Sequence, residues 1–178
     1  MLEEDPRKYD ILKKTRLQID GLDDMAEWRL LKVSMRCKWC KERADRYPQD
    51  ALRVVGFSPA EQFELFRIPA VILHIGNLLL IGDRSDQAFL PPASQAAAER
   101  VCHLLGIPVS EFIKTVLRPK VRAGREWVTH ARTKKQAEDE LGALCKFMYE
   151  KTFGWIVDRI NTALDRPSPK ASVAFIDC

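Results

Sequence analysis

The stretch Ala143-Leu-Cys-Lys-Phe-Met-Tyr-Glu-Lys-Thr-Phe-Gly-Trp-Ile-Val-Asp-Arg-Ile-Asn-Thr-Ala-Leu-Asp165 decides the fold of this chain. Its apolar residues recur at intervals of three and four, which predicts an amphipathic helix. Thr133-Lys-Lys-Gln136 is a capping-box pattern that starts this helix, and Pro167 and Pro169 end it. We therefore expect one helix over residues 133–166, on the order of 45 Å long. Further apolar side chains widen its stripe, which predicts burial on more than one side.

A basic segment, Leu117-Arg-Pro-Lys-Val-Arg-Ala-Gly-Arg-Glu-Trp-Val-Thr129, precedes the long helix. Its valines, glycine and tryptophan suit a twisted loop or an irregular hairpin. Between residues 114 and 135, one acid, Glu126, stands among the basic residues Lys114, Arg118, Lys120, Arg122, Arg125, Arg132, Lys134 and Lys135. The segment is either a solvated charged face or a surface for an acidic partner. Trp127 either anchors it on the body of the protein or belongs to the core.

The remainder of the chain also has helical patterns, so the predicted fold class is mainly α. Ser58-Pro-Ala-Glu61 combines an N-cap serine, a proline at the first helical position and a capping-box glutamate. The helix that follows contains Pro69, which predicts a kink. Gly106 is expected to end a second helix, and Ser110 to cap a third that runs through Leu117.

One convincing strand lies at residues 172–177, after the two prolines. A single strand leaves its backbone groups without partners and cannot form a sheet. We therefore expect its sheet to lie outside these residues, and the chain to be a fragment.

Composition limits the classes of function. With 46% apolar and 30% charged residues in 178, and a net charge of +4, the chain is globular rather than disordered. Five irregularly spaced cysteines argue against a disulfide framework and fit a reducing cytosol. Cys37-Lys-Trp-Cys40 is a lone pair without further ligands, so no metal site is predicted. Neither a signal peptide nor a membrane span is recognisable. His74 and His103 are predicted to be core histidines.

Several stretches occur in the order and at the intervals of one known family. Ile19-Asp-Gly-Leu-Asp-Asp24 resembles its "PGVDDAEEF", and Phe66-Arg-Ile-Pro-Ala-Val-Ile-Leu-His-Ile-Gly-Asn77 resembles its "RIVAAVLHLGN". Val101-Cys-His-Leu-Leu-Gly-Ile107 resembles a non-muscle or smooth-muscle branch. Nearly the whole chain is similar to the motor domain of a class II myosin heavy chain. The resemblance implies the helical upper actin-binding subdomain of an α/β, P-loop-type head, with a long central helix and one C-terminal strand whose sheet is missing.

The resemblance supplies a partner for the basic segment. Residues 118–130 correspond to the family's actin-contacting cardiomyopathy loop. The residues expected to steer this loop toward the acidic surface of actin are Arg118, Lys120, Arg122 and Arg125. Glu126, sixteen residues before Gly142, occupies a position that the family keeps acidic or phosphorylatable for actin-activated cycling. The implied partners are the actin filament and the rest of the heavy chain, in the cytoplasm and cytoskeleton, with no membrane, and nucleic acid is disfavoured as a partner.

The resemblance also implies Mg-ATP as a ligand of the intact parent. Asp177 corresponds to the aspartate that begins the family's switch II, "DIxGFE", and is the one residue here expected to contact that cofactor site. The sequence contains no G-x-x-x-x-G-K-[ST] pattern and no equivalent of switch I, which phosphoryl transfer requires. We expect no catalytic residue, no bound cofactor and no ATPase activity in the isolated chain.

Residues 33–49 depart from the family as an insertion. Deleting them joins Glu27-Trp-Arg-Leu-Leu-Lys32 to Asp50-Ala-Leu-Arg-Val-Val-Gly-Phe-Ser58, which then aligns without a gap to the family's "EFQLTDEAFDILGFS". The codons for Lys-Val-Ser can form a splice donor, and those for Tyr-Pro-Gln can form an acceptor. Our hypothesis is that residues 33–49 are a translated intron, which sequencing of spliced transcripts would test.

An alternative from another class is a stand-alone basic helical protein. It would bind nucleic acid or another acidic partner through residues 114–135. The sequence lacks recognised nucleic-acid motifs and stacking platforms, which weighs against this alternative.

Overall fold

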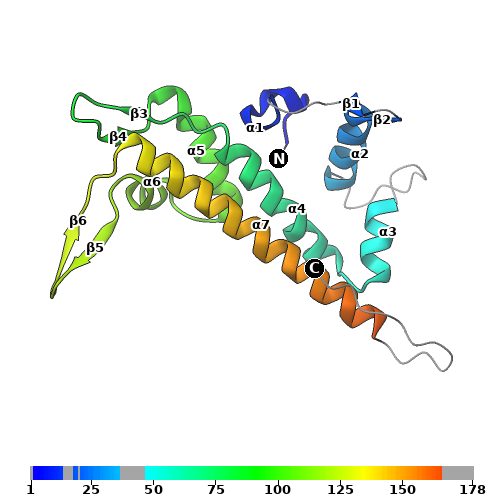
Figure 1. Ribbon diagram of the computed structural model, residues 1–178. Helices are drawn as coiled ribbons and strands as arrows, with labels where there is room; N and C mark the ends of the chain where they lie inside the picture. The colour runs from blue at the N-terminus through cyan, green and yellow to red at the C-terminus, as the bar shows by residue number, and fades with distance from the viewer. Residues whose placement is uncertain (1, 14–17, 20, 37–46, 166–178) are drawn as a thin grey trace. The chain divides into compact units, whose positions relative to one another are not determined.

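The computed structural model describes residues 2–13, 18–19, 21–36 and 47–165, and these residues are mainly helical (Figure 1). The helices are η1 (Pro6–Lys8), α1 (Asp10–Lys13), α2 (Asp24–Arg36), α3 (Tyr47–Val54), α4 (Pro59–Ile75), α5 (Pro92–Leu105), α6 (Val109–Leu117) and α7 (Lys134–Leu164). The strands are β1 (Gln18–Ile19), β2 (Leu22–Asp23), β3 (Ile81–Gly82), β4 (Ala88–Phe89), β5 (Lys120–Ala123) and β6 (Glu126–Thr129). The predicted mainly α class is confirmed. None of the described helices combines the length and apolar character that a bilayer crossing needs.

The described strands form three antiparallel pairs, β1 with β2, β3 with β4, and β5 with β6. Each pair joins consecutive strands, so these are local hairpins. The strand expected over residues 172–177 and its Asp177 lie outside the described residues, as does Cys37-Lys-Trp-Cys40. Of the segment 33–49, α2 includes its first residues up to Arg36, and α3 begins at Tyr47.

The chain divides into two compact units, and α4 and α7 each contribute to both of them. The first unit comprises Met1–Pro6, Arg16–Pro69 and Met148–Cys178. Its buried apolar side chains among the described residues include Trp28, Phe57 and Leu65. Trp28 Nε1 donates to the carbonyl oxygen of Glu3 at 3.3 Å, which ties α2 to the N-terminal segment.

The second unit comprises Arg7–Thr15 and Ala70–Phe147. Its core contains Tyr9, Val71, His74, Val101, Cys102, Phe112, Val116, Ala137 and Leu141. Tyr9 lies edge-on to His74 with ring centroids 5.4 Å apart. The amide of Asn77 accepts from the Asp10 N–H at 2.9 Å and donates to the Lys8 carbonyl at 3.1 Å. These contacts hold η1 and α1 against the end of α4.

Local capping chemistry sets several helix ends as expected. Ser58 and Glu61 form a reciprocal capping box at the start of α4, as do Thr133 and Gln136 at the start of α7. Gly106 ends α5 in the left-handed region, with φ 70°. The prediction for Ser110 was wrong: α6 begins at Val109 and its N-cap is Pro108, so Ser110 lies within the first turn.

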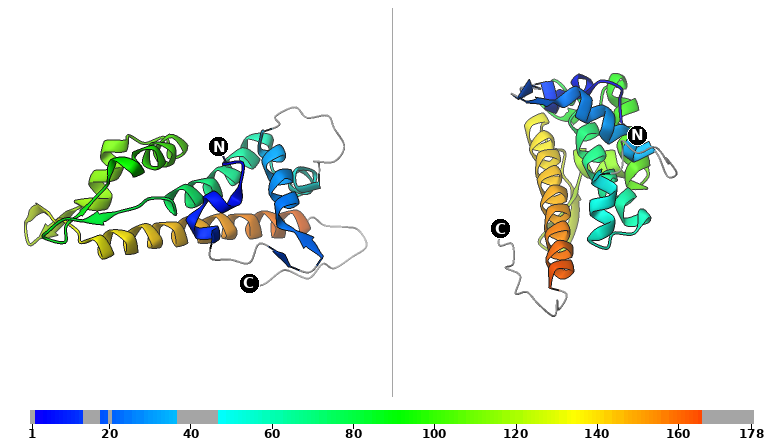
Figure 2. Two further views of the ribbon diagram at one scale, coloured as in Figure 1. Left: turned by 90° about the horizontal axis from the view of Figure 1, so that it is seen from above. Right: turned by 90° about the vertical axis from the view of Figure 1, so that its right-hand side faces the viewer.

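The long helix was expected over residues 133–166 and is observed as Lys134–Leu164, one uninterrupted helix in every view (Figures 1 and 2). The expectation of burial on more than one side is wrong for the described structure. Only Ala137 and Leu141 of α7 are buried. Its large apolar side chains Phe147, Tyr149, Phe153 and Trp155 are 36% or more exposed, because the described residues do not cover them.

Candidate functional site

The basic segment folds as a regular hairpin. β5 and β6 pair in the register Lys120–Thr129, Val121–Val128, Arg122–Trp127 and Ala123–Glu126. The two residues between the strands, Gly124 and Arg125, form the turn. Gly124 has φ 64°, whereas the φ of Arg125 is not positive. These two signs are those of a type II′ turn. We call residues 120–129 the basic hairpin.

The register separates the basic hairpin into two faces, because partners in a pair point to the same side and successive residues alternate. One face carries Lys120, Arg122, Trp127 and Thr129. The opposite face carries Val121, Ala123, Glu126 and Val128. The structure therefore brings Lys120 and Arg122 together beside an indole ring, and places Glu126 on the other side with two valines.

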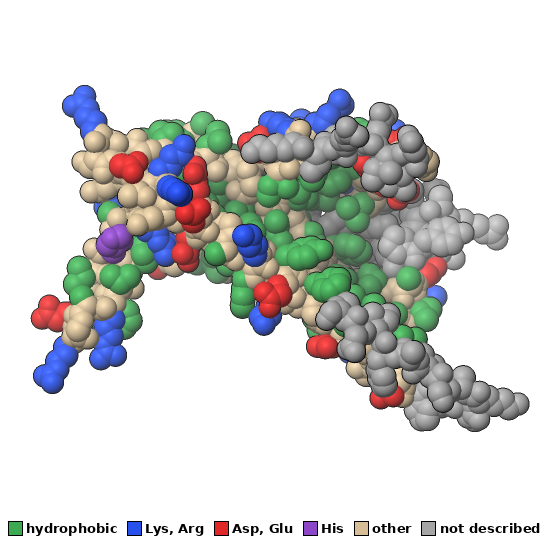
Figure 3. All heavy atoms as spheres, in the orientation of Figure 1, with side chains coloured by type: hydrophobic (Ala, Val, Ile, Leu, Met, Phe, Trp, Pro, Cys, Tyr) green, Lys and Arg blue, Asp and Glu red, His purple; other side chains and the backbone are tan. Residues whose placement is uncertain are grey.

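Every residue from 120 to 130 is exposed to solvent. Figure 3 shows Lys and Arg side chains and one acidic side chain gathered at the tip of this hairpin, with apolar groups beside them. The exposed fraction of Trp127 is 69%, which excludes it from the core of the chain, and those of Val121 and Val128 are 43% and 47%. Protein–protein interfaces share this composition of exposed aromatic and apolar side chains beside charged ones.

Two of the candidate basic residues lie outside the paired strands. Arg118 is the C-cap residue of α6, where its N–H donates to the carbonyl oxygen of Lys114 at 2.8 Å. Arg125 lies in the turn, at the tip. The guanidinium of Arg122 is directed along the hairpin, since its Nε donates to the Gly124 carbonyl at 3.1 Å. The five candidate residues, Glu126 included, thus extend from the C-cap of α6 to the hairpin tip instead of converging on one point.

The base of the basic hairpin is held by contacts that sequence reasoning did not identify. Arg132 was recognised only as part of a basic run. Its Nη1 donates to the carbonyl oxygens of Thr115 and Val116, at 3.2 and 2.9 Å, and its Nη2 pairs with Glu140 at 3.0 Å. Backbone bonds from His130 N–H to Pro119 and from Arg132 N–H to Leu117, at 3.0 and 2.9 Å, close the stem.

The stem is also bonded to the β3–β4 hairpin of the same unit. The Ala88 N–H donates to the Arg132 carbonyl at 2.9 Å, and Gln87 forms an isolated bridge with Thr133. Asp86, a non-glycine residue at φ 57°, presents its carbonyl to the Lys134 N–H at 3.3 Å. The base of the basic hairpin is therefore fixed between α6, α7 and a second hairpin, while its tip is exposed to solvent among the described residues.

The described residues offer little for chemical catalysis. They contain no group of three or more His, Cys, Asp or Glu side chains that could hold a metal ion. Burial raises the pKa of the Cys102 and Cys145 thiols, which disfavours the nucleophilic thiolate. His74 is buried as predicted, whereas His103 is exposed, so its assignment to the core was wrong. Asp177 lies outside the described residues.

Comparison with known proteins agrees with the sequence resemblance. The family model for the myosin head (motor domain) matches residues 1–177. Myosin type-2 heavy chain 1 of Schizosaccharomyces pombe is 34% identical over 171 residues, which cover 96% of this chain and 10% of that protein. Human Myosin-14 is 41% identical over 128 residues, covering 71% of this chain and 6% of its own length. The chain spans a tenth or less of these relatives.

Proposed function

The chain belongs to the myosin head family, and we propose that it is a segment of an actin-based, ATP-driven cytoskeletal motor whose basic hairpin contacts the actin filament. The observation that supports this most is the fully exposed hairpin, which presents cations, an indole ring and valines on a fixed base. Such a surface complements an acidic partner with apolar patches. The partners of the parent are then the filament and the rest of the heavy chain, in the cytoplasm and cytoskeleton.

Within this proposal Arg118 and the residues of the basic hairpin have different roles. Arg118, Lys120, Arg122 and Arg125 attract the acidic filament surface over a Debye length of about 8–10 Å, so association weakens with salt. Val121 and Val128 supply apolar contact once the hairpin is seated. Glu126, on the same face as the valines, is the permanently acidic residue that couples filament binding to the motor cycle.

Nucleotide chemistry belongs to the intact parent in this proposal. Mg-ATP would be bound there, with Asp177 contributing to its site, and the isolated chain would hydrolyse no ATP. The sequence contains no phosphate loop of the G-x-x-x-x-G-K-[ST] type, whose lysine neutralises the β- and γ-phosphates.

The proposal is tested by cosedimentation of the purified chain with actin filaments at several salt concentrations, with duplex DNA as competitor at matched salt. We expect the chain to pellet with filaments, to bind less as salt rises, and to be displaced only weakly by DNA. Failure to pellet at low salt, or preference for the duplex, would reject actin as the partner of the hairpin.

The role of Glu126 is tested in an intact motor that carries this segment. Glu126→Ala should lower actin-activated ATP turnover severalfold while basal turnover stays unchanged. The matched control is Asp139→Ala, which removes an exposed acid on α7 outside the hairpin. Equal activation in Glu126→Ala and in the unmodified motor would remove the claim.

A further inference from the structure

The junction between α3 and α4 is a tight elbow built from two adjoining caps. Gly56, with φ 91°, ends α3 in a Schellman motif: its N–H donates to Arg53 at 2.9 Å and the Phe57 N–H donates to Leu52 at 2.9 Å. The next residue, Ser58, is already the N-cap of α4. We call Gly56-Phe57-Ser58 the elbow. These local bonds hold its backbone at the corner between the two helices.

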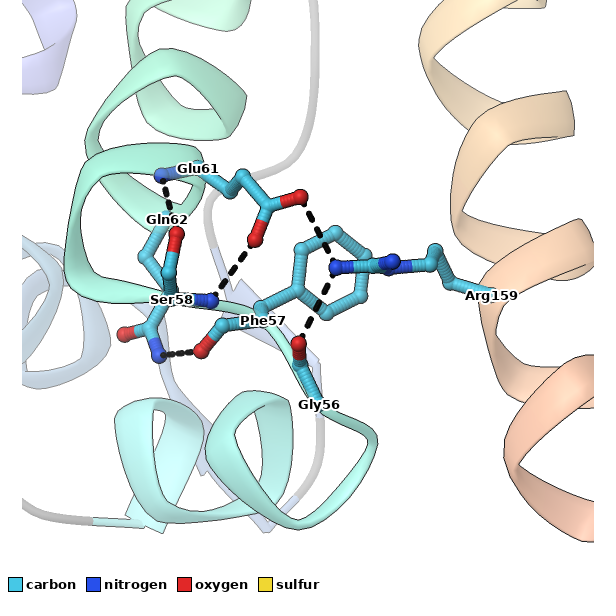
Figure 4. Close-up of polar contacts among 6 residues, drawn as sticks. All are labelled: Gly56, Phe57, Ser58, Glu61, Gln62 and Arg159. Atoms are coloured by element: carbon cyan, nitrogen blue, oxygen red, sulfur yellow. Dashed lines mark hydrogen bonds and ion pairs between the residues drawn. The ribbon is translucent and has the colours of Figure 1, made fainter.

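One arginine of α7 binds this elbow (Figure 4). Arg159 Nη2 donates to the carbonyl oxygen of Gly56 at 3.0 Å and to Oε1 of Glu61 at 2.8 Å. Its guanidinium carbon also lies 5.2 Å from the centre of the Phe57 ring. These contacts join residues about a hundred positions apart in the sequence, all within the first unit.

The apolar part of the contact is made one turn earlier on α7. Phe57 is 2% exposed and packs edge-on against Trp155, with ring centroids 5.1 Å apart. Trp155 and Arg159 are spaced i, i+4 and so lie on the same face of the helix. That face therefore covers the Phe57 ring with an indole on one side and a cation on another.

The electrostatics make Glu61 essential to this contact. The N-terminus of α4 carries a partial positive charge, so a guanidinium beside it is unfavourable unless an anion is interposed. Glu61 provides that anion: Oε2 accepts from the Ser58 N–H at 2.8 Å, while Oε1 accepts from Arg159. Arg159 Nε is buried and has no acceptor among the described residues, which increases its dependence on Glu61.

We propose that Arg159 and Glu61 are positioning residues of the motor, a clamp by which α7 holds the elbow and transmits to α4 a change that begins at the basic hairpin. The proposal rests on the proposed function, because the change at the hairpin is filament binding. α7 is continuous from Lys134, beside the hairpin base, to Leu164, beyond Arg159. The clamp therefore converts a displacement of this helix into a displacement of the N-terminus of α4.

The clamp can be separated from the cap by the choice of variant. Glu61→Gln keeps a capping-box side chain, because Gln serves at this position, but removes the charge that holds Arg159. Ser58→Ala removes the cap hydroxyl and leaves the ion pair. Arg159→Lys keeps the positive charge but removes the planar guanidinium that donates to both the Glu61 carboxylate and the Gly56 carbonyl.

The first measurement is amide hydrogen exchange at Gly56, Phe57 and the first turn of α4 in the purified chain. Glu61→Gln should accelerate exchange there roughly threefold to tenfold, and Arg159→Lys should do so by a similar factor. In the unmodified chain, added salt should accelerate it in the same direction, an effect absent from Glu61→Gln. The clamp is refuted if exchange is unchanged in Glu61→Gln, or if only Ser58→Ala alters it. This result requires no actin filament in the experiment.

The second measurement repeats the exchange with saturating actin filaments. Filament binding should alter exchange at the elbow in the unmodified chain and leave it unaltered in Glu61→Gln, although both chains cosediment equally. If the chain cosediments and the elbow does not respond, transmission through the clamp is refuted while the proposed function stands. If the chain does not cosediment, the proposed function fails, transmission fails with it, and the first measurement still decides whether the clamp exists.

Discussion

Arg132 and Arg159 lie near the two ends of α7. Each binds a glutamate and at least one backbone carbonyl at the end of another helix, two carbonyls for Arg132 and one for Arg159. Arg132 binds the last turn of α6, where carbonyls lack partners and the helix dipole favours a cation. Arg159 lies where α3 ends and α4 begins, so the Gly56 carbonyl at the end of α3 favours its charge while the N-terminus of α4 opposes it. The same side chain is thus placed in a favourable field at one site and between two helix ends of opposite sign at the other.

The comparison indicates which contacts each region depends on. At the hairpin base, Arg132 retains two carbonyl acceptors if Glu140 is lost. At the elbow, Arg159 retains one carbonyl if Glu61 is lost, and the apolar contact of Phe57 with Trp155 remains. The hairpin base is therefore held mainly by polar bonds, whereas the elbow combines a buried ring with a charge-dependent clamp.

The largest expected effect concerns the two aromatic residues of these regions. Phe57→Ala should destabilise the chain by about 3–5 kcal/mol, because it empties a buried site between Trp155 and Arg159. Trp127→Ala, at an exposed position on the hairpin, should change stability by less than about 0.5 kcal/mol. Urea unfolding followed by circular dichroism measures both. Similar losses of unfolding free energy in the two variants would contradict the view that Phe57 is packed in the protein and Trp127 is not.

Next in size is the loss of the hairpin-base arginine. Arg132→Ala should cost about 1.5–3 kcal/mol, since it removes charged hydrogen bonds from the Thr115 and Val116 carbonyls. Arg125→Ala, in the exposed turn, is the control and should be nearly neutral. Thermal unfolding of both variants provides the measurement. A neutral Arg132→Ala would show that the backbone bonds of the stem suffice.

Loss of charge at Glu140 and at Glu61 should have unequal effects on stability, although each glutamate forms one ion pair with an arginine. Glu140→Gln should cost at most about 1 kcal/mol, because Arg132 keeps its carbonyl acceptors and a half-exposed pair is weak. Glu61→Gln should lower the melting temperature further than Glu140→Gln, because it leaves Arg159 at the positive end of a helix. Equal shifts in melting temperature would remove the dipole argument.

The smallest expected effect is a pH dependence confined to the elbow. Hydrogen bonds from the Ser58 N–H and hydroxyl, and then the Arg159 charge, hold the pKa of Glu61 below its usual value. A depressed carboxyl pKa adds stability above the unfolded value of about 4.3, and this stability is lost as pH falls through the folded pKa. The stability difference between the unmodified chain and Glu61→Gln should therefore shrink below about pH 4. A constant difference down to pH 2 would contradict it.

Much of the fold followed from local patterns in the sequence. The capping boxes at Ser58 and Thr133 and the terminal glycine at 106 were correctly predicted, because each depends on residues three or four positions apart. The basic segment was predicted as a twisted loop or an irregular hairpin, and the structure has a regular hairpin with Gly124 and Arg125 in its turn. That register determined which side chains share a face, which the sequence pattern alone had not resolved.

The remainder depended on contacts between distant residues. The bonds of Arg132 to α6 and of Arg159 to the elbow join segments 16–17 and 98–103 positions apart, and no local pattern marks them. His74 and His103 occupy similar apolar segments, yet only His74 faces Tyr9 and is buried. The exposed face of α7 likewise shows that an apolar stripe predicts a need for burial without identifying what covers it.

The most direct test of the central claim, that the basic hairpin binds actin, compares two triple variants of equal charge. One carries Lys120→Ser, Arg122→Ser and Arg125→Ser on the hairpin. The other carries Arg29→Ser, Arg84→Ser and Lys146→Ser, at exposed positions elsewhere. Cosedimentation with filaments at low salt should show about a tenfold loss of affinity for the hairpin variant and little change for the control. Equal weakening of both would mean that net charge, and not the hairpin, draws the chain to the filament.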